Sequence, residues 1–207
     1  EGYSNLYRIW KNKNVEHKLS ETIRVFLSHI INPETHHFNL FFDEQWQCKS
    51  NRISFGHDIE GSWLLMEAAD VLGNSDLQSK TKDVAIQMVD AVLQQGVDKD
   101  GGILYEGDSS GIIDSDKHWW PQAEAVVGFL NAYQTTWDEK YLNAAIKNAN
   151  FVKTTMFDNG TLTHSFREGK HSEGQFLEDY AYYISGLIAL FEADPSDDKF
   201  TWLDFAT

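Results

Sequence analysis

The sequence predicts an all-α fold, an α/α toroid in which buried inner helices alternate with half-exposed outer helices. Three observations lead to this prediction. Apolar residues recur at helical spacing along most of the 207 residues. The predicted helices come in pairs, and each pair begins with acidic residues, namely Glu60, Glu124, and Glu178 with Asp179. The first helix of a pair is apolar on more than one side, whereas the second has one polar face, which is typical of an inner helix followed by a surface helix.

The first half of the chain contains helical segments and one extended segment. Residues 2–10 resemble the second half of a helix, so we expect the chain to begin inside a larger protein. Residues 19–30 carry an apolar stripe. In residues 38–55 apolar and polar residues alternate, which predicts a short hairpin or an extended loop. A helix is predicted over 59–72, and Ser75 is predicted to cap the helix that follows it.

The second half of the chain repeats this pattern of paired helices. Residues 98–118 contain two glycine-rich turns and predict a long loop, and long loops in compact domains usually carry function. Helical spacing predicts a buried helix over 119–134 and an amphipathic one that begins at the capping residue Asp138 and ends near 152. A further apolar helix is predicted over 176–193, and a short last helix over 198–206.

These segments amount to about three helical hairpins and a leading half-helix. So few hairpins cannot close a six-hairpin ring, so the sequence predicts an incomplete toroid. A second copy of the chain could complete the ring as a homodimer. Residues 1–207 are expected to form a single domain, with a change in composition near 135–160.

The composition narrows the range of partners. The formal net charge of −15 argues against nucleic acid and against an anionic membrane surface, and it suits a neutral ligand. No apolar run approaches the roughly 20 residues that cross a bilayer, and the first residues show no signal-peptide pattern. Cys48 is the single cysteine, which fits a reducing compartment, so a cytoplasmic location is expected.

The candidate site lies where the inner helices begin. His57 and Glu60 are three positions apart, so both can face the same side of a helix. A neutral imidazole can remove a proton from a carbon next to a carbonyl, and a nearby carboxylate can orient it. The alternative is that Asp58 and Glu60 only complement the dipole of the helix N-terminus.

A second motif supplies flat aromatic side chains beside an acid. Trp119 and Trp120 can stack on sugar rings, and Glu124 shares a helix face with Trp120. Adjacent residues point about 100° apart on a helix, so we expect one indole in the cavity and one packed inside. The alternatives are two core tryptophans and a buried acid that pairs with Arg or Lys. Glu178 and Asp179 begin the third inner helix, so they and Asp58 are further candidate substrate contacts.

Other site chemistries are not indicated. The histidine pairs His36-His37 and His164 with His171 lack the spacing of a zinc site. Asp98, Asp100 and Gly101 resemble part of a calcium loop, but the later bidentate acid is misplaced. We therefore predict neither a metal nor a cofactor.

Residues 1–135 resemble the cellobiose 2-epimerases of the N-acylglucosamine 2-epimerase superfamily. The resemblance rests on residues 3–8, 40–43 and, most specifically, on Phe55–Leu65 (FGHDIEGSWLL) and Trp119–Phe129 (WWPQAEAVVGF). It implies an (α/α)6 barrel and epimerisation at C2 of the reducing-end glucose of β-1,4 disaccharides, without a metal or cofactor. It also implies that His57 is a catalytic base or acid with Glu60 as its partner, and that Trp119, Trp120 and Glu124 contact the substrate.

In this family two histidines act on opposite faces of the sugar carbon, through a cis-enediolate. The second histidine lies in a Cys-Pro-Tyr-His-like stretch, for which this sequence has no counterpart. Residues 138–207 are instead similar to the C-terminal toroid of the thioredoxin-domain-containing spermatogenesis-associated family. His164 or His171 could replace the second histidine only if this tail folds back over the rim.

Two other functions remain open at this point. The first is a glycoside hydrolase that uses two carboxylates, such as Glu124 with Glu178 or Asp179. The second is an inactive carbohydrate-binding fragment or an engineered chimera, because one of the two bases has no visible counterpart. The expected partner in either case is a neutral disaccharide.

Overall fold

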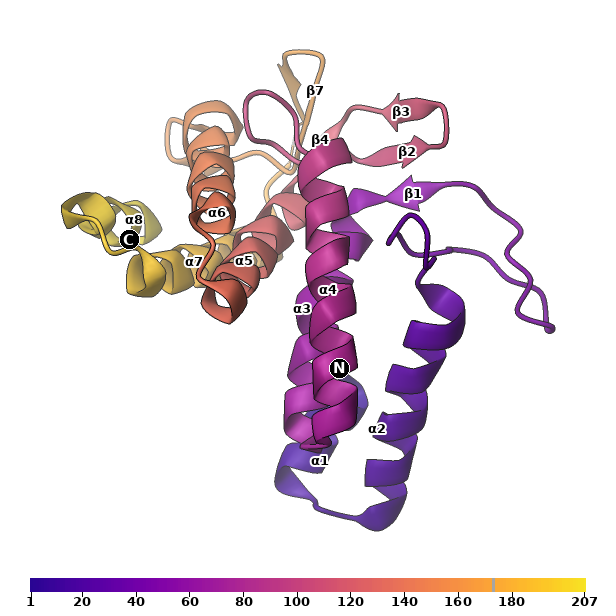
Figure 1. Ribbon diagram of the computed structural model, residues 1–207. Coiled ribbons are helices and arrows are strands. Elements are labelled where there is room, and N and C mark those ends of the chain that lie inside the picture. The colour runs from indigo at the N-terminus through magenta and orange to yellow at the C-terminus, as the bar shows by residue number, and fades with distance from the viewer. Residues whose placement is uncertain (173) are drawn as a thin grey trace.

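Most of the described chain forms helices that alternate between an inner and an outer position (Figure 1). We describe it from a computed structural model, which covers residues 1–172 and 174–207. The inner helices are α1 (Gly2–Ile9), α3 (Phe55–Leu72), α5 (Trp119–Thr136) and α7 (Leu177–Ala193). The outer helices are α2 (Lys13–Val25), α4 (Ser75–Gln95), α6 (Glu139–Phe151) and α8 (Phe200–Ala206).

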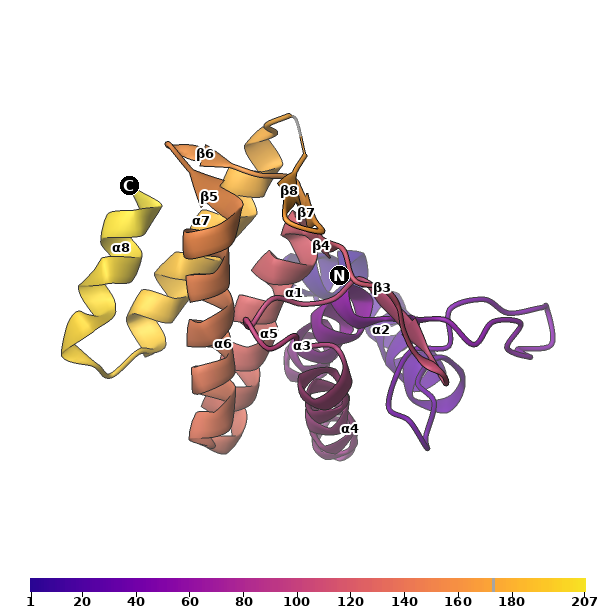
Figure 2. The ribbon, with the colours of Figure 1, turned by 90° about the horizontal axis from the view of Figure 1, so that it is seen from above.

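Packing between the helices confirms the predicted toroid architecture. Helix α3 packs against α1 and α5, α5 packs against α7, and each outer helix packs on the inner helix before it. Seen from above, the described helices follow an open arc (Figure 2). The predicted leading half-helix is α1, which pairs with α2, so the described part of the chain holds four helix pairs. The prediction that a second copy of the chain completes the ring stays a prediction.

Local signals explain where the helices begin and end. Gly73 ends α3 with a left-handed φ of 75°, a conformation that glycine adopts without strain. The next helix is capped by Asn74, not by Ser75 as predicted, because the Asn74 side chain accepts a hydrogen bond from the Leu77 amide. Asp138 caps α6 as predicted. Short π-helical turns, η1 (Phe26–Ile30) and η2 (Val152–Met156), extend α2 and α6.

One hydrophobic core joins α3 to α8 and runs across the composition change near 135–160. Ile59 and Phe129 are fully buried in it. Gly128 lets α3 and α5 approach closely, because a Cβ at this position would lie 2.6 Å from the Ile59 Cγ1 atom. A smaller core cluster holds α1 and α2 against the second half of α3. No helix in the described ranges is both long enough and apolar enough to cross a bilayer.

Short strands join the connections at one rim of the arc. One antiparallel sheet has the order β1-β2-β3, and the other has the order β4-β7-β8. A separate hairpin pairs β5 with β6. The bounds are β1 (Ile53–Ser54), β2 (Glu106–Asp108), β3 (Gly111–Asp114), β4 (Lys117–His118), β5 (Phe157–Asp158), β6 (Thr161–Leu162), β7 (Ser165–Arg167) and β8 (Lys170–His171). Residues 98–118 are therefore an ordered hairpin segment. Of residues 38–55, for which the sequence predicts a short hairpin or an extended loop, 38–52 form a loop with one antiparallel bridge between Phe42 and Cys48, and 53–54 form β1.

Candidate active site

His57 lies in the first turn of α3 and is exposed. Its Nδ1 atom is 2.7 Å from the Ser54 hydroxyl oxygen, which leaves Nε2 as the ring atom available to a ligand. The indole of Trp120, from the first turn of α5, packs beside the imidazole with ring centroids 4.9 Å apart. Glycine is required at position 56 for this contact, because a Cβ there would lie 2.5 Å from the Trp120 ring. The two motifs that the sequence singles out therefore meet.

Two half-buried carboxyl groups lie on the same side of α3 and α5. Burial raises the pKa of Glu60, although the neighbouring His57 opposes this effect. Burial also raises the pKa of Glu124 to about 7, and the charge of Glu60 adds to the increase. The Trp63 indole N–H donates a hydrogen bond to Glu124 Oε2 at 2.8 Å. Glu124 is therefore partly protonated near neutral pH, and its partner is an indole, not the Arg or Lys that the alternative interpretation required.

Sequence reasoning missed the role of Trp63. Trp63 follows Glu60 by three positions, so the helical spacing places both on one face of α3, and this spacing was the available signal. The hydrogen bond from Trp63 to Glu124 joins the two inner helices at the level of the site.

His57 and Glu60 line a cavity of about 270 Å³ between α1, α2 and α3. Its walls are mainly apolar and include Phe38 and Leu64. Apolar walls of this kind favour the neutral form of a carboxyl group, in agreement with the raised pKa of Glu60. A larger groove of about 1260 Å³ lies outside this region, between α4, residues 32–53 and the β2–β3 turn, and none of the predicted site residues lines it.

Asp58 points away from His57 and into the protein. It is fully buried, with Oδ2 2.7 Å from His37 Nδ1 and with Oδ1 accepting a hydrogen bond from the Phe38 amide at 2.7 Å. Burial raises its pKa, and the His37 contact opposes the increase. The prediction that Asp58 contacts a sugar is therefore not supported, because its carboxylate is buried and engaged on both oxygens. Consecutive helical residues point about 100° apart, so Asp58 and the exposed His57 lie on different sides of α3. Asp58 instead anchors the segment that precedes the extended loop.

The two tryptophans at the beginning of α5 point toward different neighbours. Trp120 contacts His57 on the α3 side, as described above. Trp119 faces the α7 side, where its ring centroid lies 6.0 Å from that of His164 and 5.8 Å from that of Tyr182. Both indoles are half-buried, so each has a face toward the protein and an exposed part. The two side chains diverge as expected for adjacent helical residues. However, neither indole is packed fully inside the core, as the sequence predicts for one of them.

The tail of the chain folds back to the beginning of α5. Strand β7 pairs with β4, and the Trp119 amide donates a hydrogen bond to the His164 carbonyl oxygen at 3.0 Å. The buried carboxylate of Asp179 accepts a hydrogen bond from His164 Nδ1 at 2.9 Å. Asp179 is thus a hydrogen-bond partner of His164. It is not the free substrate contact that the sequence predicts. Glu178 is exposed beside it and remains a predicted contact.

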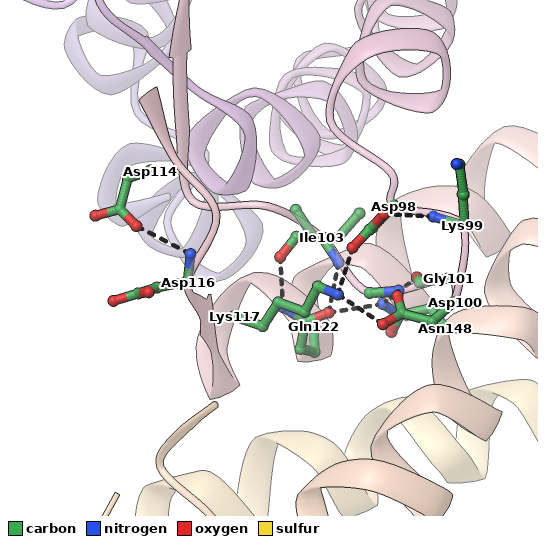
Figure 3. Close-up of polar contacts among 11 residues, drawn as sticks. Asp98, Lys99, Asp100, Gly101, Ile103, Asp114, Asp116, Lys117, Gln122 and Asn148 are labelled. Carbon is green, nitrogen blue, oxygen red and sulfur yellow. Dashed lines mark hydrogen bonds and ion pairs between the residues drawn. The ribbon is translucent and has the colours of Figure 1, made fainter. Parts of the chain in front are cut away.

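A polar network below the rim fixes the beginning of α5 (Figure 3). The buried Lys117 ammonium binds the carboxylates of Asp98 and Asp100 at 2.7 and 2.6 Å. The fully buried Gln122 side chain binds the main chain of Ile103 as both donor and acceptor. Asp98 and Asp100, whose sequence resembles part of a calcium loop, therefore bind the ammonium group of Lys117. Within residues 1–172 and 174–207 no group of three or more His, Cys, Asp or Glu could hold a metal ion.

Comparisons with known proteins agree with this geometry. The sequence model of the N-acylglucosamine 2-epimerase family matches residues 5–176. Cellobiose 2-epimerase of Bacteroides fragilis is 42% identical over 159 residues, which make up 76% of this chain and 40% of that protein. The corresponding enzyme of Dictyoglomus turgidum is 34% identical over 158 residues, again 76% of this chain and 40% of that protein.

Solved structures show the same relationship. Cellobiose 2-epimerase from Bacillus thermoamylovorans superposes with a TM-score of 0.78 at 35% identity, covering 82% of this chain and 44% of that chain. An unsaturated glucuronyl hydrolase from Bacillus sp. GL1 has a TM-score of 0.76 at 13% identity over 99% of this chain and 57% of its own, and it shares the fold alone. The chain spans less than half the length of the epimerases it matches. By its sequence motifs and its helical arc, this chain belongs to the N-acylglucosamine 2-epimerase family.

Proposed function

We propose that this chain is part of a carbohydrate 2-epimerase that acts on the reducing-end glucose of a neutral β-1,4 disaccharide such as cellobiose. The observation that carries the proposal is the position of His57. Its imidazole is exposed at the beginning of an inner helix, tilted by 60° against the Trp120 ring and next to the half-buried Glu60. A base beside an indole face suits a sugar substrate, because the indole binds the ring while the base removes a proton.

The proposed reaction begins with the open-chain aldehyde of the reducing sugar. His57 Nε2 removes the proton from C2, the C–H electron pair forms the C1–C2 double bond, and the C1 carbonyl becomes the oxyanion of a cis-enediolate. Glu124, whose pKa is about 7, carries a proton that it can share with an enediolate oxygen. A second acid on the side of the sugar opposite His57 then donates a proton to C2, the C1–C2 double-bond electrons form the new C–H bond, and C1 regains its carbonyl, which gives the mannose configuration. Proton transfers of this kind need only acids and bases.

Isotope exchange tests this proposal. The protein is incubated with cellobiose in heavy water, and the sugar is followed by NMR. We expect signals of glucosyl-mannose together with deuterium at C2, and we expect a His57→Asn variant to lose both. A His17→Asn variant serves as the matched control, because His17 is an exposed histidine of α2 that is distant from His57 in the sequence. Full activity of His57→Asn would exclude this residue as the base.

The rival functions predict different results. Release of glucose in the same NMR spectra would indicate hydrolysis. Binding of cellobiose measured by calorimetry, without any exchange at C2, would indicate a binding fragment. The structure argues against a hydrolytic pair of Glu124 with Asp179, because the Asp179 carboxylate is buried and engaged by His164. For the location of the protein, the exposed free thiol of Cys48 supports the cytoplasm as the proposed compartment.

A further inference from the structure

The groove beside the outer helix α4 contains none of the residues assigned to the proposed reaction. Its volume is about 1260 Å³, and its walls are α4, residues 32–53 and the β2–β3 turn. The loop and the turn extend to the same side of the molecule (Figures 1 and 2). Small-molecule sites usually have volumes of about 300–1,000 Å³, so this groove has room for an extended ligand.

Carboxamide side chains line both sides of this groove. Three glutamines of α4 lie on one face of the helix around the buried Ala91, namely Gln87, Gln94 and Gln95. These glutamines are exposed, so their amides are accessible to a ligand. The other side of the groove contributes Asn32, Asn39 and Asn51. A carboxamide both donates and accepts hydrogen bonds, so these side chains suit a neutral ligand with many hydroxyl groups.

The lysine and the arginine of the groove are engaged by acids outside it. Lys49 pairs with Asp43 at 2.6 Å, and Arg52 pairs with Glu106 at 2.7 Å. Three carboxylates also line the groove, those of Glu34, Asp90 and Asp108. An acidic ligand would face these carboxylates while the two cations are already paired, so the groove favours an uncharged ligand.

A buried histidine at the bottom of the groove has an unsatisfied ring atom. His37 lines the groove although only 2% of its surface is exposed. Its Nδ1 atom is 2.7 Å from Oδ2 of Asp58, whose carboxylate also accepts the Phe38 amide, so the ring proton lies on Nδ1 and Nε2 keeps its lone pair. Nε2 has no hydrogen-bond partner among the described residues, and a ligand hydroxyl at the bottom of the groove would supply the donor.

Apolar side chains complete the lining of the groove. Phe38 and Ile53 both line it, and both are half-buried. Phe38 also lines the cavity beside His57, so this residue lies between the groove and that cavity. A sugar has hydroxyl groups at its edge and apolar C–H groups on its faces, and an aromatic ring can pack against such a face. The groove therefore offers both kinds of surface that a sugar chain requires.

We propose that this groove is a second binding site, and that its ligand is a neutral oligosaccharide. The hydroxyl groups of the ligand hydrogen-bond with the carboxamides of α4 and of residues 32–53, and its C–H faces pack against Phe38 and Ile53. This inference goes beyond the proposed epimerase function, because neither His57 nor Glu60 lines the groove.

The test is an NMR titration with methyl β-cellotetraoside, a neutral tetrasaccharide that has no reducing end. It cannot open a terminal ring to an aldehyde, so the reaction proposed for His57 does not consume it. We expect saturable shifts of the side-chain amide signals of Gln87 and Gln94 and of the Nε2 resonance of His37. Tetragalacturonic acid, an acidic tetrasaccharide, is expected to leave these signals unchanged.

A charge placed in the groove tests the same contacts. Gln94→Glu removes an amide donor and adds a negative charge, so we expect the affinity for the neutral tetrasaccharide to fall at least about 10-fold. Gln134→Glu is the matched control and is expected to bind as the wild type does, because Gln134 is an exposed glutamine of α5 that does not line the groove. Near-ultraviolet circular dichroism verifies that both variants keep their packed aromatic residues.

Several results would overturn the inference. They are unchanged groove signals, equal shifts with the acidic tetrasaccharide, and wild-type affinity in Gln94→Glu or an equal loss of affinity in Gln134→Glu. Shifts confined to residues around His57 would also overturn it, because they would indicate binding at the proposed active site alone. Absence of C2 exchange with cellobiose would contradict only the proposed function, so the two failures are distinguishable.

Discussion

The raised pKa of Glu124 makes the stability of this protein depend on pH, and Glu124→Gln removes that dependence. Burial shifts this pKa from 4.5 to about 7, so the folded protein holds a proton that the unfolded chain has released above pH 4.5. When the pKa of a group is higher in the folded state than in the unfolded state, the group stabilises the fold at pH values below its unfolded-state pKa. This stabilisation is lost as the pH rises through its folded-state pKa. The affected window therefore extends from about pH 4.5 to about pH 7.

The size of the effect follows from the shift. A shift of about 2.5 pH units corresponds to about 3.4 kcal/mol at 1.36 kcal/mol per unit. The carboxyl group is only partly buried, so solvent screening reduces this to about 1.5 kcal/mol. Glutamine is neutral at all these pH values, and its side-chain oxygen can still accept the Trp63 hydrogen bond. We expect Glu124→Gln to gain about 1.5 kcal/mol over the wild type between pH 4.5 and pH 8.

Urea unfolding of both proteins at several pH values between 4.5 and 8 measures this difference. Glu178→Gln is the matched control, because Glu178 is an exposed glutamate in the first turn of another inner helix, and its curve should run parallel to the wild-type curve. Parallel curves for Glu124→Gln as well would refute the assignment of a raised pKa to Glu124.

Three further substitutions test the packing around the site. Gly56→Ala places a Cβ 2.5 Å from the Trp120 ring, so we expect a loss of about 1–3 kcal/mol and altered tryptophan fluorescence; unchanged fluorescence would contradict the ring contact. Asp58→Ala leaves a buried histidine ring and an amide without their acceptor, so urea unfolding should show a loss of about 3 kcal/mol. Lys117→Met removes a buried cation whose two aspartates remain near solvent, so we expect a loss below about 1.5 kcal/mol in the same assay, and a larger loss would contradict this view of the network.

The sequence predicted the architecture because the apolar pattern records burial directly. The inner helices α3 and α5 are apolar around most of their circumference, and the structure places each of them between an outer helix and its inner neighbours. The caps were harder to assign, because Asn74 and Ser75 are both good capping residues and only the geometry shows which one accepts the amide. The β2–β3 hairpin was missed because its short strands are glycine-rich and depend on pairing with β1.

The site was predicted as a set of residues but not as a set of contacts. The sequence placed Asp58 among the substrate contacts, whereas the structure buries it, and nothing local identified His37 as its partner 21 positions earlier. The link between His164 and Asp179 likewise depends on the pairing of β4 with β7, a contact between distant segments. Long-range pairing of this kind leaves no periodic signal in the sequence.

The different orientations of His57 and Asp58 have a consequence for insertions and deletions in helix α3. Deleting one residue from the first turn of α3, ahead of His57, rotates the next ones by about 100°. Such a rotation would carry the imidazole to the place of Gly56, against the Trp120 ring, and would carry the fully buried carboxylate toward the opening. The exposure of His57 and the burial of Asp58 thus depend on the same rotational orientation of helix α3.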